Sequence, residues 1–359
     1  MSNNTTQFNQ LDKSMQNALF QLKKQVKRVF VTGAGGFLGK ALCSYLRSVD
    51  IDVVGFARSD YPALKKMGVT LFRGDIADKQ ALLNAMQSCD LVFHVASKAG
   101  VWGSKKSYFS PNVTGCENII SACQELNITR LVYTSTPSVT FSGTDENGID
   151  ESQPYAAKFL NFYGLSKAIA EQKVLQANGS LLKNQQTLKT VALRPHLIWG
   201  PGDPHLIPRV LARAATGKLK LIGKEDKLVD TIYIDNAVYA HLLAAIRLDD
   251  LLPICAGKAY FLSNDQPILM ADMLNKILAC KGIKPVTKRI PAALAYAVGS
   301  ILELTYKALR KQNEPIMTRF VARQLSTSHY FNISAAKTDL NYQALISIDQ
   351  GMEKLKASL

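Results

Sequence analysis

The sequence lacks most features that would assign a chain to a specialised class of protein. Its six cysteines form no CxxC pair and show no His/Cys spacing of a metal site, so we expect neither disulfides nor a bound metal. The first residues contain no apolar segment of a secretory signal, and no repeat or low-complexity segment follows. No nucleic-acid-binding signature accompanies the net charge of +15, so nucleic acid is not an expected partner. These absences favour a cytoplasmic protein with reduced, buried cysteines.

Apolar residues, by contrast, are plentiful. They make up 47% of 359 residues, enough for two domains or for one large α/β domain with a lobe. Near the start, leucine and methionine recur at helical spacing, which predicts an amphipathic helix over residues 11–24. We treat residues 1–26 as an N-terminal appendage to the fold.

The stretch from Val29 to Arg58 is organised as strand, glycine-rich loop, helix and strand. An apolar run leads into the loop TGAGGFLG, and a second apolar strand over residues 51–57 follows the helix. This order is typical of the βαβ unit of dinucleotide-binding proteins. The unit is the first part of an expected α/β fold.

Five residues of this loop are expected to contact the coenzyme. Gly33 and Gly36 allow a tight turn and a close approach of the backbone to a pyrophosphate. Gly39 lets the helix pack closely on the strand. Phe37 and Leu38 begin this helix, whose free N–H groups and positive dipole end face the phosphates.

Arg58 indicates which dinucleotide is bound. NAD-binding units have an Asp or Glu at the end of the second strand, where the carboxylate accepts hydrogen bonds from the ribose hydroxyls. A guanidinium has no acceptor to offer, but it suits a 2′-phosphate. We therefore expect NADP(H), with a merely solvated strand-end residue as the alternative for Arg58.

Strands and helices alternate through the rest of the first half, which is typical of a Rossmann-type doubly wound parallel sheet. Strands are expected at residues 69–72, 90–97, 130–135 and 190–193, with a break at Arg194-Pro195-His196, and helices at 79–88, 111–126 and 159–176. Ligands lie beyond the carboxyl ends of such strands, which places one rim at Asp75, Ile76, Ala96, Ser97 and residues 134–136.

The looser pattern after residue 205 predicts a second region. The NADP-binding core is expected at 27–205, and a smaller C-terminal α+β substrate lobe at 206–359 that partly returns to the core. Helices are expected there at residues 208–216, 235–246, 270–281 and 291–309.

Tyr163 and Lys167 are candidates for catalysis. They are four residues apart on a helix and therefore share a face. A nearby ammonium lowers the pKa of a phenol, which makes it a better proton donor. Thr136 ends a strand, where its hydroxyl could hold a substrate carbonyl opposite the tyrosine; Ser135 is the alternative.

Several motifs together resemble the extended short-chain dehydrogenase/reductases. They are TGAGGFLG, GDI, HVAS, YTSTPSV, YGLSK and LRPHLIWGPGDP, in this order, and the resemblance covers about Lys27–Leu355. Within that group the chain is similar to the 3β-hydroxysteroid dehydrogenase-like branch. Residues 193–208 look most like the bacterial 2-alkyl-3-oxoalkanoate reductases of olefin biosynthesis.

The resemblance implies roles for the site residues. Tyr163 would be the general acid, Lys167 would lower its pKa and bind the ribose, and Thr136 would orient the carbonyl. The coenzyme would also contact Asp75 and Ile76 beside the adenine, Ala96 and Ser97 along its length, and Pro195 beside the nicotinamide.

The resemblance also implies a reaction, the NADPH-dependent reduction of the 3-keto group of a 2-alkyl-3-oxoalkanoate to the 3-hydroxy acid. A 3β-hydroxysteroid or sterol dehydrogenase is the alternative; a sugar-nucleotide epimerase and a non-catalytic NADP-binding subunit are less favoured. Expected partners are a lipid-like keto acid and other enzymes of an olefin pathway. A homodimer through the helices at 111–126 and 159–176 is a further expectation.

Two features bear on the substrate and on membranes. His196 and Trp199 follow Pro195, so they could reach the substrate pocket, although a core position is the alternative for His196. The helix at 291–309 is the most apolar outside the sheet and is interrupted by charge, so it does not span a bilayer. We favour a helix that faces the lobe core, over one that covers an acyl tunnel or touches a membrane surface. The basic residues before it are either solvated or attract an anionic lipid head or the substrate carboxylate; they are Lys281, Lys284, Lys288 and Arg289.

Overall fold

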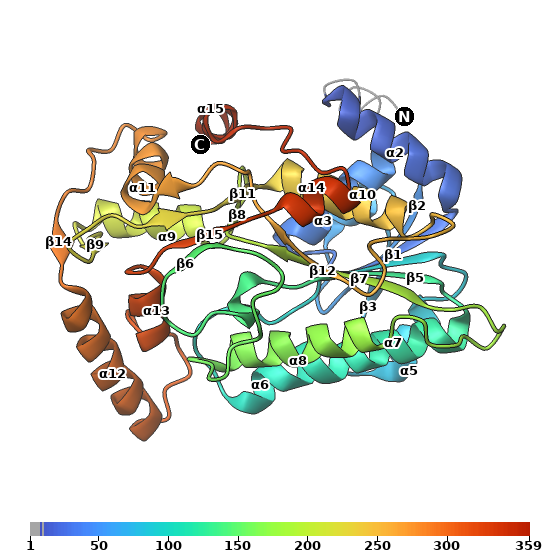
Figure 1. The fold of residues 1–359 in the computed structure, drawn as a ribbon, viewed down its shortest axis with the longest axis horizontal. Coiled ribbons are helices and arrows are strands. Elements are labelled where there is room, and N and C mark those ends of the chain that lie inside the picture. Colours follow the sequence, from blue (N-terminus) through green and yellow to red (C-terminus); the bar gives the residue numbers. More distant parts are fainter. Residues whose placement is uncertain (1–7, 9–10) are drawn as a thin grey trace.

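The centre of the fold is a seven-stranded sheet in which every strand pair is parallel (Figure 1). The computed structural model describes Phe8 and residues 11–359, and its strand order is β12-β7-β5-β4-β1-β2-β3. The strands are β1 (Arg28–Thr32), β2 (Asp52–Ala57), β3 (Thr70–Arg73), β4 (Leu91–His94), β5 (Arg130–Thr134), β7 (Lys189–Pro195) and β12 (Ala259–Leu262). The order reverses direction between β1 and β4, which creates a ligand crevice at their carboxyl ends. This confirms the Rossmann-type doubly wound sheet.

Helices cover both faces of this sheet (Figure 1). One face is covered by α2 (Lys13–Gln25), α3 (Phe37–Ser48) and α10 (Ile234–Arg247), and the other by α5 (Lys79–Ala85), α7 (Gly115–Leu126) and α8 (Phe162–Gln176). The strands between them are almost continuous apolar runs because side chains on both faces are buried. The helix expected at the start of the chain is α2, and its buried face packs against α10.

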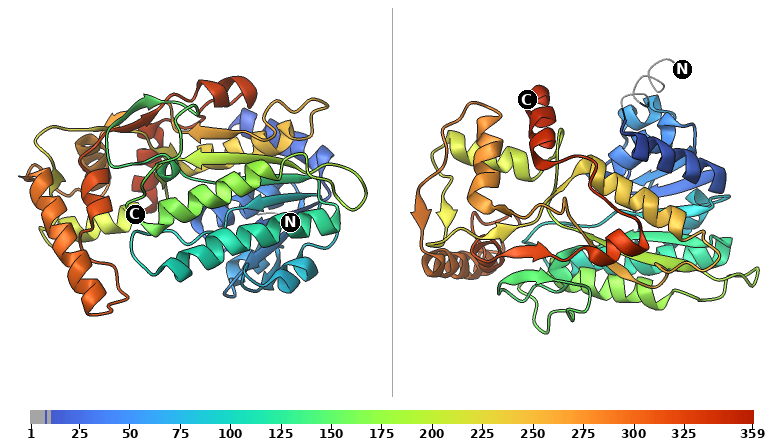
Figure 2. Two further views of the ribbon diagram at one scale, coloured as in Figure 1. Left: turned by 60° about the horizontal axis from the view of Figure 1, so that its bottom comes forward. Right: turned by 45° about the horizontal axis from the view of Figure 1, so that its top comes forward.

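The remaining elements build the lobe at one end of the molecule (Figures 1 and 2). Its four-stranded sheet contains β13 (Ile268–Leu269), β10 (Leu228–Val229), β15 (His329–Phe331) and β6 (Glu146–Ile149). Two small sheets pair β8 (Ile198–Trp199) with β11 (Ile232–Tyr233) and β9 (Leu221–Ile222) with β14 (Arg289–Ile290). The lobe helices are α9 (Leu206–Ala215), α11 (Met270–Ala279), α12 (Ala292–Ala308), α13 (Arg319–Gln324) and α15 (Ile348–Ser358). Helix α14 (Ser334–Asp339) instead packs against β12 of the core sheet.

Two local features differ from the expected pattern. Strand β7 continues through Arg194 and ends at Pro195. A proline is tolerated there because it lacks only its own N–H, and the next N–H, that of His196, still donates to β12. The helix expected at 111–126 begins with a π-helical turn, Ser110–Thr114, in which Gly115 N–H donates to the Ser110 carbonyl. Pro111 lacks an N–H and crowds the preceding turn, which favours this wider hydrogen-bonding pattern.

All six cysteines are free thiols, and five of them are buried. Burial raises the pKa of Cys43, Cys89, Cys116 and Cys255 to about 12. No helix in the described part of the chain is both long and apolar enough to cross a bilayer.

Candidate active site

Helix α8 and the end of β5 bring Tyr163 and Thr136 together. Asn161 caps α8, since its side chain accepts a hydrogen bond from the Gly164 N–H at 2.9 Å. A Cβ at Gly164 would lie 2.9 Å from the Ser138 carbonyl oxygen, so only glycine lets α8 approach the segment after β5 this closely. That approach positions Tyr163 beside Thr136.

Tyr163 lies beside Thr136, which follows the end of β5. Burial raises the pKa of Tyr163, and the neighbouring Thr136 hydroxyl opposes the rise. Thr136 Oγ1 also accepts from the Ser138 N–H at 3.3 Å, which fixes the threonine rotamer. Ser135, the alternative hydroxyl, is 4% exposed and its Oγ has no described partner. The geometry therefore favours Thr136 over Ser135.

Lys167 lies one helical turn after Tyr163 and is 1% exposed. Its Nζ donates to the Thr134 carbonyl at 2.6 Å and lies 4.2 Å from the centroid of the Tyr133 ring. Burial lowers the pKa of Lys167 to about 8. The ammonium is thus anchored at the carboxyl end of β5, next to the tyrosine and threonine.

A buried polar network behind Lys167 was not predicted from the sequence. Glu171 is fully buried, and its carboxylate accepts from Arg194 Nη2 at 2.6 Å and from the Tyr155 hydroxyl at 2.8 Å. Asn112 Nδ2 donates to Ser166 Oγ at 2.9 Å and its Oδ1 accepts from a backbone N–H of the loop after β4. The spacing of Glu171, four residues after Lys167, was the only available signal for this network. These contacts hold α8 in one position relative to the sheet.

The glycine loop has the shape that a pyrophosphate requires. Gly33 has φ +64°, and a Cβ there would lie 2.9 Å from Ala96 Cα. Gly36 is the N-cap of α3 and provides no capping side chain, so the first N–H groups of that helix face outward. A Cβ at Gly39 would collide with the Gly33 carbonyl. The glycine loop therefore has room for a phosphate, but no room for a side chain at Gly33 or Gly39.

The other residues expected to bind the coenzyme lie along the same rim. Arg58 follows β2 and is exposed, without a hydrogen-bond or ion-pair partner in the described part of the chain. Asp75 is exposed and accepts from Ala77 N–H, whereas Ile76 is buried and packs against Gly115. After β4 the Ala96 N–H donates to Thr32, Ser97 is exposed, and Pro195 is buried at the end of β7.

His196 and Trp199 are not brought to this rim. His196 is 6% exposed, and its Nδ1 lies 2.7 Å from the Asp230 carbonyl; burial lowers its pKa to about 3. Trp199 is fully buried, donates to Thr231 and packs edge-on against Tyr233. Leu197 between them has φ +46°, which turns the chain away from the direction of β7. Both side chains lie in the packing between core and lobe.

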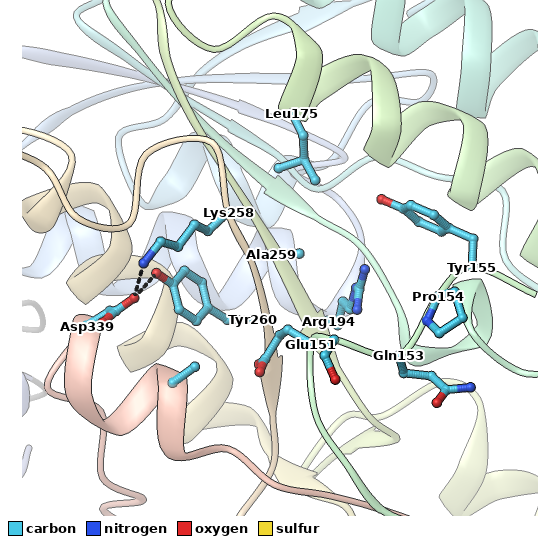
Figure 3. Close-up of a pocket in the computed structure, with 12 residues that line it drawn as sticks. Glu151, Gln153, Pro154, Tyr155, Leu175, Arg194, Lys258, Ala259, Tyr260 and Asp339 are labelled. Carbon is cyan, nitrogen blue, oxygen red and sulfur yellow. Dashed lines mark hydrogen bonds and ion pairs between the residues drawn. The ribbon is translucent and has the colours of Figure 1, made fainter.

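A pocket of about 420 Å³ opens beside the edge strand β12 (Figure 3). It is lined by Glu151, Tyr155, Arg194, Tyr260 and Asp339 among others. None of Tyr163, Lys167 and Thr136 lines it. The pocket therefore shares the Arg194 region with the network behind Lys167 but is separate from the catalytic candidates. In the described part of the chain, no three His, Cys, Asp or Glu side chains converge as metal ligands would.

Comparison with known proteins assigns a family. Residues 30–290 match the family model described as the 3-beta hydroxysteroid dehydrogenase/isomerase family. The chain belongs to the 3-beta hydroxysteroid dehydrogenase/isomerase family. Members of this family are oxidoreductases that use a nicotinamide dinucleotide, which agrees with the glycine cradle and the Tyr/Lys/Thr arrangement.

Curated members of the family cover almost the whole chain. A 2-alkyl-3-oxoalkanoate reductase of Shewanella oneidensis is 63% identical over 350 residues, 97% of this chain and 90% of that protein. One of Stenotrophomonas maltophilia is 48% identical over 92% of this chain and 99% of that protein. A mouse sterol-4-alpha-carboxylate 3-dehydrogenase (decarboxylating) is 32% identical over 92% of this chain and 90% of that protein.

Solved structures support the fold. The crystal structure of gox2253 has a TM-score of 0.73 at 22% identity and covers 92% of this chain and 97% of its own. At this identity the similarity shows a shared fold and nothing about the substrate.

Proposed function

We propose that the protein reduces the 3-keto group of a 2-alkyl-3-oxoalkanoate to a 2-alkyl-3-hydroxyalkanoate, with NADPH as the reductant. The observation that carries this proposal is the 63% identity to a reductase of that name, combined with the placement of Tyr163 beside Thr136 and a buried Lys167 on the same helix. The substrate is a β-keto acid, which loses its carboxylate readily, whereas the β-hydroxy product does not. The reaction therefore preserves the carboxylate for a later step of an olefin pathway.

The catalytic roles follow from the positions of the three side chains. NADPH, when bound, supplies the hydride that becomes bonded to C3 of the substrate. Thr136 holds the carbonyl oxygen, and the Tyr163 hydroxyl gives it the proton that completes the new alcohol. Lys167, anchored at the end of β5 and one helical turn after Tyr163, is the cation we assign to stabilise the phenolate that remains. Solvent then returns a proton to Tyr163.

The coenzyme preference rests on arginine side chains at one corner of the sheet. Arg58 is exposed and has no partner within the described residues, so its guanidinium is free to bind a phosphate. Arg73, not singled out from the sequence, is exposed at the end of β3, in register with Ala57 beside Arg58. Two guanidinium groups on neighbouring strand ends favour a 2′-phosphate over two hydroxyls. We propose that both bind NADP(H).

A sterol dehydrogenase is the second candidate, because a sterol-4-alpha-carboxylate 3-dehydrogenase is 32% identical over 336 residues. Its name also describes oxidoreduction at a carbon near a carboxylate. The same three side chains would serve either substrate, so only the substrate pocket separates the two candidates.

The test is a substrate panel with the purified full-length protein. NADPH consumption would be followed with a 2-alkyl-3-oxoalkanoate, a 3-keto sterol and a UDP-sugar, and the product identified by mass spectrometry. We expect the keto acid alone to yield the 3-hydroxy acid. Faster turnover of the sterol would replace the proposal by the second candidate, and no turnover of either would refute both.

Three further proposals concern organisation. We divide the chain into an appendage (1–26), an NADP-binding core (27–205) and a substrate lobe (206–359) from which α10 and β12 return to the core sheet. We also propose a homodimer through α7 and α8, testable by sedimentation velocity. The enzyme that supplies the substrate must join two acyl chains, and it is a candidate partner.

A further inference from the structure

Helix α12 has the reverse of the usual distribution of polar and apolar residues. Its inner side, which packs on the lobe, carries Ala295, Gly299 and Glu303 at intervals of four residues. A Cβ at Gly299 would lie 2.6 Å from the Thr318 carbonyl carbon, so the helix backbone touches the start of α13. The buried contact between α12 and the lobe thus runs along one side of the helix. It is flanked by the partly buried Tyr296, whose ring lies under Arg323, and Tyr306, whose ring packs against Trp102.

The only charged side chain on this inner side is fully paired. Glu303 accepts from the Arg319 N–H at 2.7 Å and from Arg319 Nε at 2.9 Å. The helix is therefore anchored to the lobe by an ion pair and a backbone contact. Its large apolar side chains are not needed for this attachment.

Those large side chains lie on the outer side instead. Leu294, Val298, Ile301 and Leu304 are 53%, 39%, 63% and 69% exposed, at intervals of four, three and three residues. Smaller side chains next to these four are also exposed; they are Ala293, Ala297, Thr305 and Ala308. Thr305 donates its hydroxyl to the Ile301 carbonyl, so it needs no outside partner. We call these eight residues the outer face of α12, and none of them is charged.

No element within the described residues, Phe8 and 11–359, covers this face. Figures 1 and 2 show α12 at the end of the molecule remote from α2, with α13 and β14 as its neighbours. A continuous apolar face of this kind on a folded protein indicates a contact with another molecule or with lipid.

The charges around the outer face decide between these occupants. Cations stand at both ends of the helix: exposed Lys284 and Lys288 precede it, and exposed Lys307, Arg310 and Lys311 belong to its end. No acidic partner is described for any of these five. In residues 281–313 the one acid is Glu303, whose carboxylate is already used. Lys311 Nζ lies over the Tyr306 ring, but none of the five has an anionic partner in the described part of the chain. An apolar face flanked by such cations complements a bilayer with anionic headgroups, which takes the apolar side chains into its acyl region.

We propose that the outer face of α12 docks on an anionic lipid membrane. The helix then lies in the plane of the interface, with its cations at the headgroups and the rest of the molecule in water. The inference goes beyond the reductase function and does not depend on it.

The docked helix would lie next to the coenzyme rim. The Trp102 ring packs edge-on against Tyr306, and its Nε1 donates to the Lys311 carbonyl at 3.2 Å. Trp102 belongs to the loop that begins at Ser97 on the rim. A membrane-bound α12 therefore places the loop after β4 near the source of a lipid-like substrate.

The test is co-sedimentation of the full-length protein with vesicles of phosphatidylcholine alone or mixed with phosphatidylglycerol. We expect binding to the mixed vesicles and its loss at high salt, because salt screens the cations. Lys307→Gln/Arg310→Gln/Lys311→Gln should weaken binding about fivefold for each cation removed. Ile301→Gln/Leu304→Gln should abolish binding to the mixed vesicles.

Leu251→Gln/Leu252→Gln is the matched control, because these leucines are 100% and 86% exposed in the loop between α10 and β12. The control should bind vesicles like the original protein. Equal loss in the control would overturn the proposal, and so would recovery of the unaltered protein in the supernatant with both vesicle types.

A second copy of the chain is the competing occupant. If sedimentation velocity without vesicles showed that Ile301→Gln/Leu304→Gln dissociates an oligomer, while vesicle binding was absent, the face would be a protein interface. Turnover of a short-chain, water-soluble keto acid should be unchanged in every variant. This measurement keeps a failure of membrane docking separate from a failure of the proposed reaction.

Discussion

Helices α8 and α12 both depart from the usual arrangement, in which polar residues face water and apolar residues face the core, but in opposite ways. Helix α8 buries Lys167 and Glu171 and gives each of them a partner inside the chain. Helix α12 exposes Ile301 and Leu304 and gives them none. The difference separates two kinds of function. A polar group that the fold satisfies itself supports chemistry within the molecule, whereas an apolar group that it leaves uncovered indicates a contact outside.

The largest expected effect is on turnover, at α8. Tyr163→Phe removes the proton donor and should lower kcat by about 10²–10⁴-fold, while NADPH binding measured by fluorescence titration is retained. The outer-face variant Ile301→Gln/Leu304→Gln serves as the comparison and should keep kcat with a soluble substrate. Retention of most of the activity in Tyr163→Phe would remove the proposed acid.

The two helices should also differ in how much the loss of an ion pair lowers the free energy of unfolding. Glu171→Gln leaves Arg194 buried without its partner and should lower the free energy of unfolding by about 3–5 kcal/mol in urea denaturation. Glu303→Gln should cost at most about half as much, because Arg319 is 39% exposed and water can solvate its charge. Equal losses would mean that the inner side of α12 is as dependent on its ion pair as α8.

The same contrast applies to two arginines. Arg194 is 3% exposed and paired with Glu171, whereas Arg58 is exposed and unpaired, so only Arg58 is free for a ligand. Arg58→Ala should raise the KM for NADPH about 10–100-fold and leave the KM for NADH unchanged. Arg73→Ala should act in the same direction, and Arg310→Ala is the control. A parallel rise in both KM values would argue against phosphate recognition.

The most gradual effect is a pH dependence of stability. The pKa of Lys167 is about 8 in the folded protein against 10.5 in a model peptide, because of burial. Between pH 8 and pH 10.5 the unfolded chain binds the proton more tightly than the folded chain does. Burial of the ammonium therefore lowers the free energy of unfolding fully below pH 8, and this loss diminishes as the pH rises toward 10.5. The difference in unfolding free energy between the original protein and Lys167→Met should therefore change by up to about 1.4 kcal/mol per pH unit in this window. A constant difference would mean that Lys167 titrates normally.

Local signals were sufficient to predict the sheet and the glycine loop. Glycines, apolar runs and their spacing depend on backbone geometry, which the local sequence encodes, and the fold confirms them. The rule that ligands bind beyond the carboxyl ends of parallel strands predicted only that Thr136 lies on the rim; its proximity to Tyr163 depends on how α8 packs.

The packing of residues that are distant in the sequence could not be predicted from such local signals. Trp199 follows Pro195 in the sequence, but Leu197 turns the chain and directs the indole into the core. We also favoured an α12 that faces the lobe core, yet its large apolar side chains point outward, since Gly299 and Glu303 take the inner positions. Hydrophobic content predicted the helix, but not which side the lobe would cover.

The buried cysteines have a practical consequence. Five of the six thiols are inaccessible and have a raised pKa, so at neutral pH they are poor nucleophiles toward alkylating reagents. A new cysteine on the outer face of α12, such as Ile301→Cys, would therefore react far ahead of them. An environment-sensitive fluorophore attached there would report directly whether this helix enters an apolar phase, in the otherwise native protein.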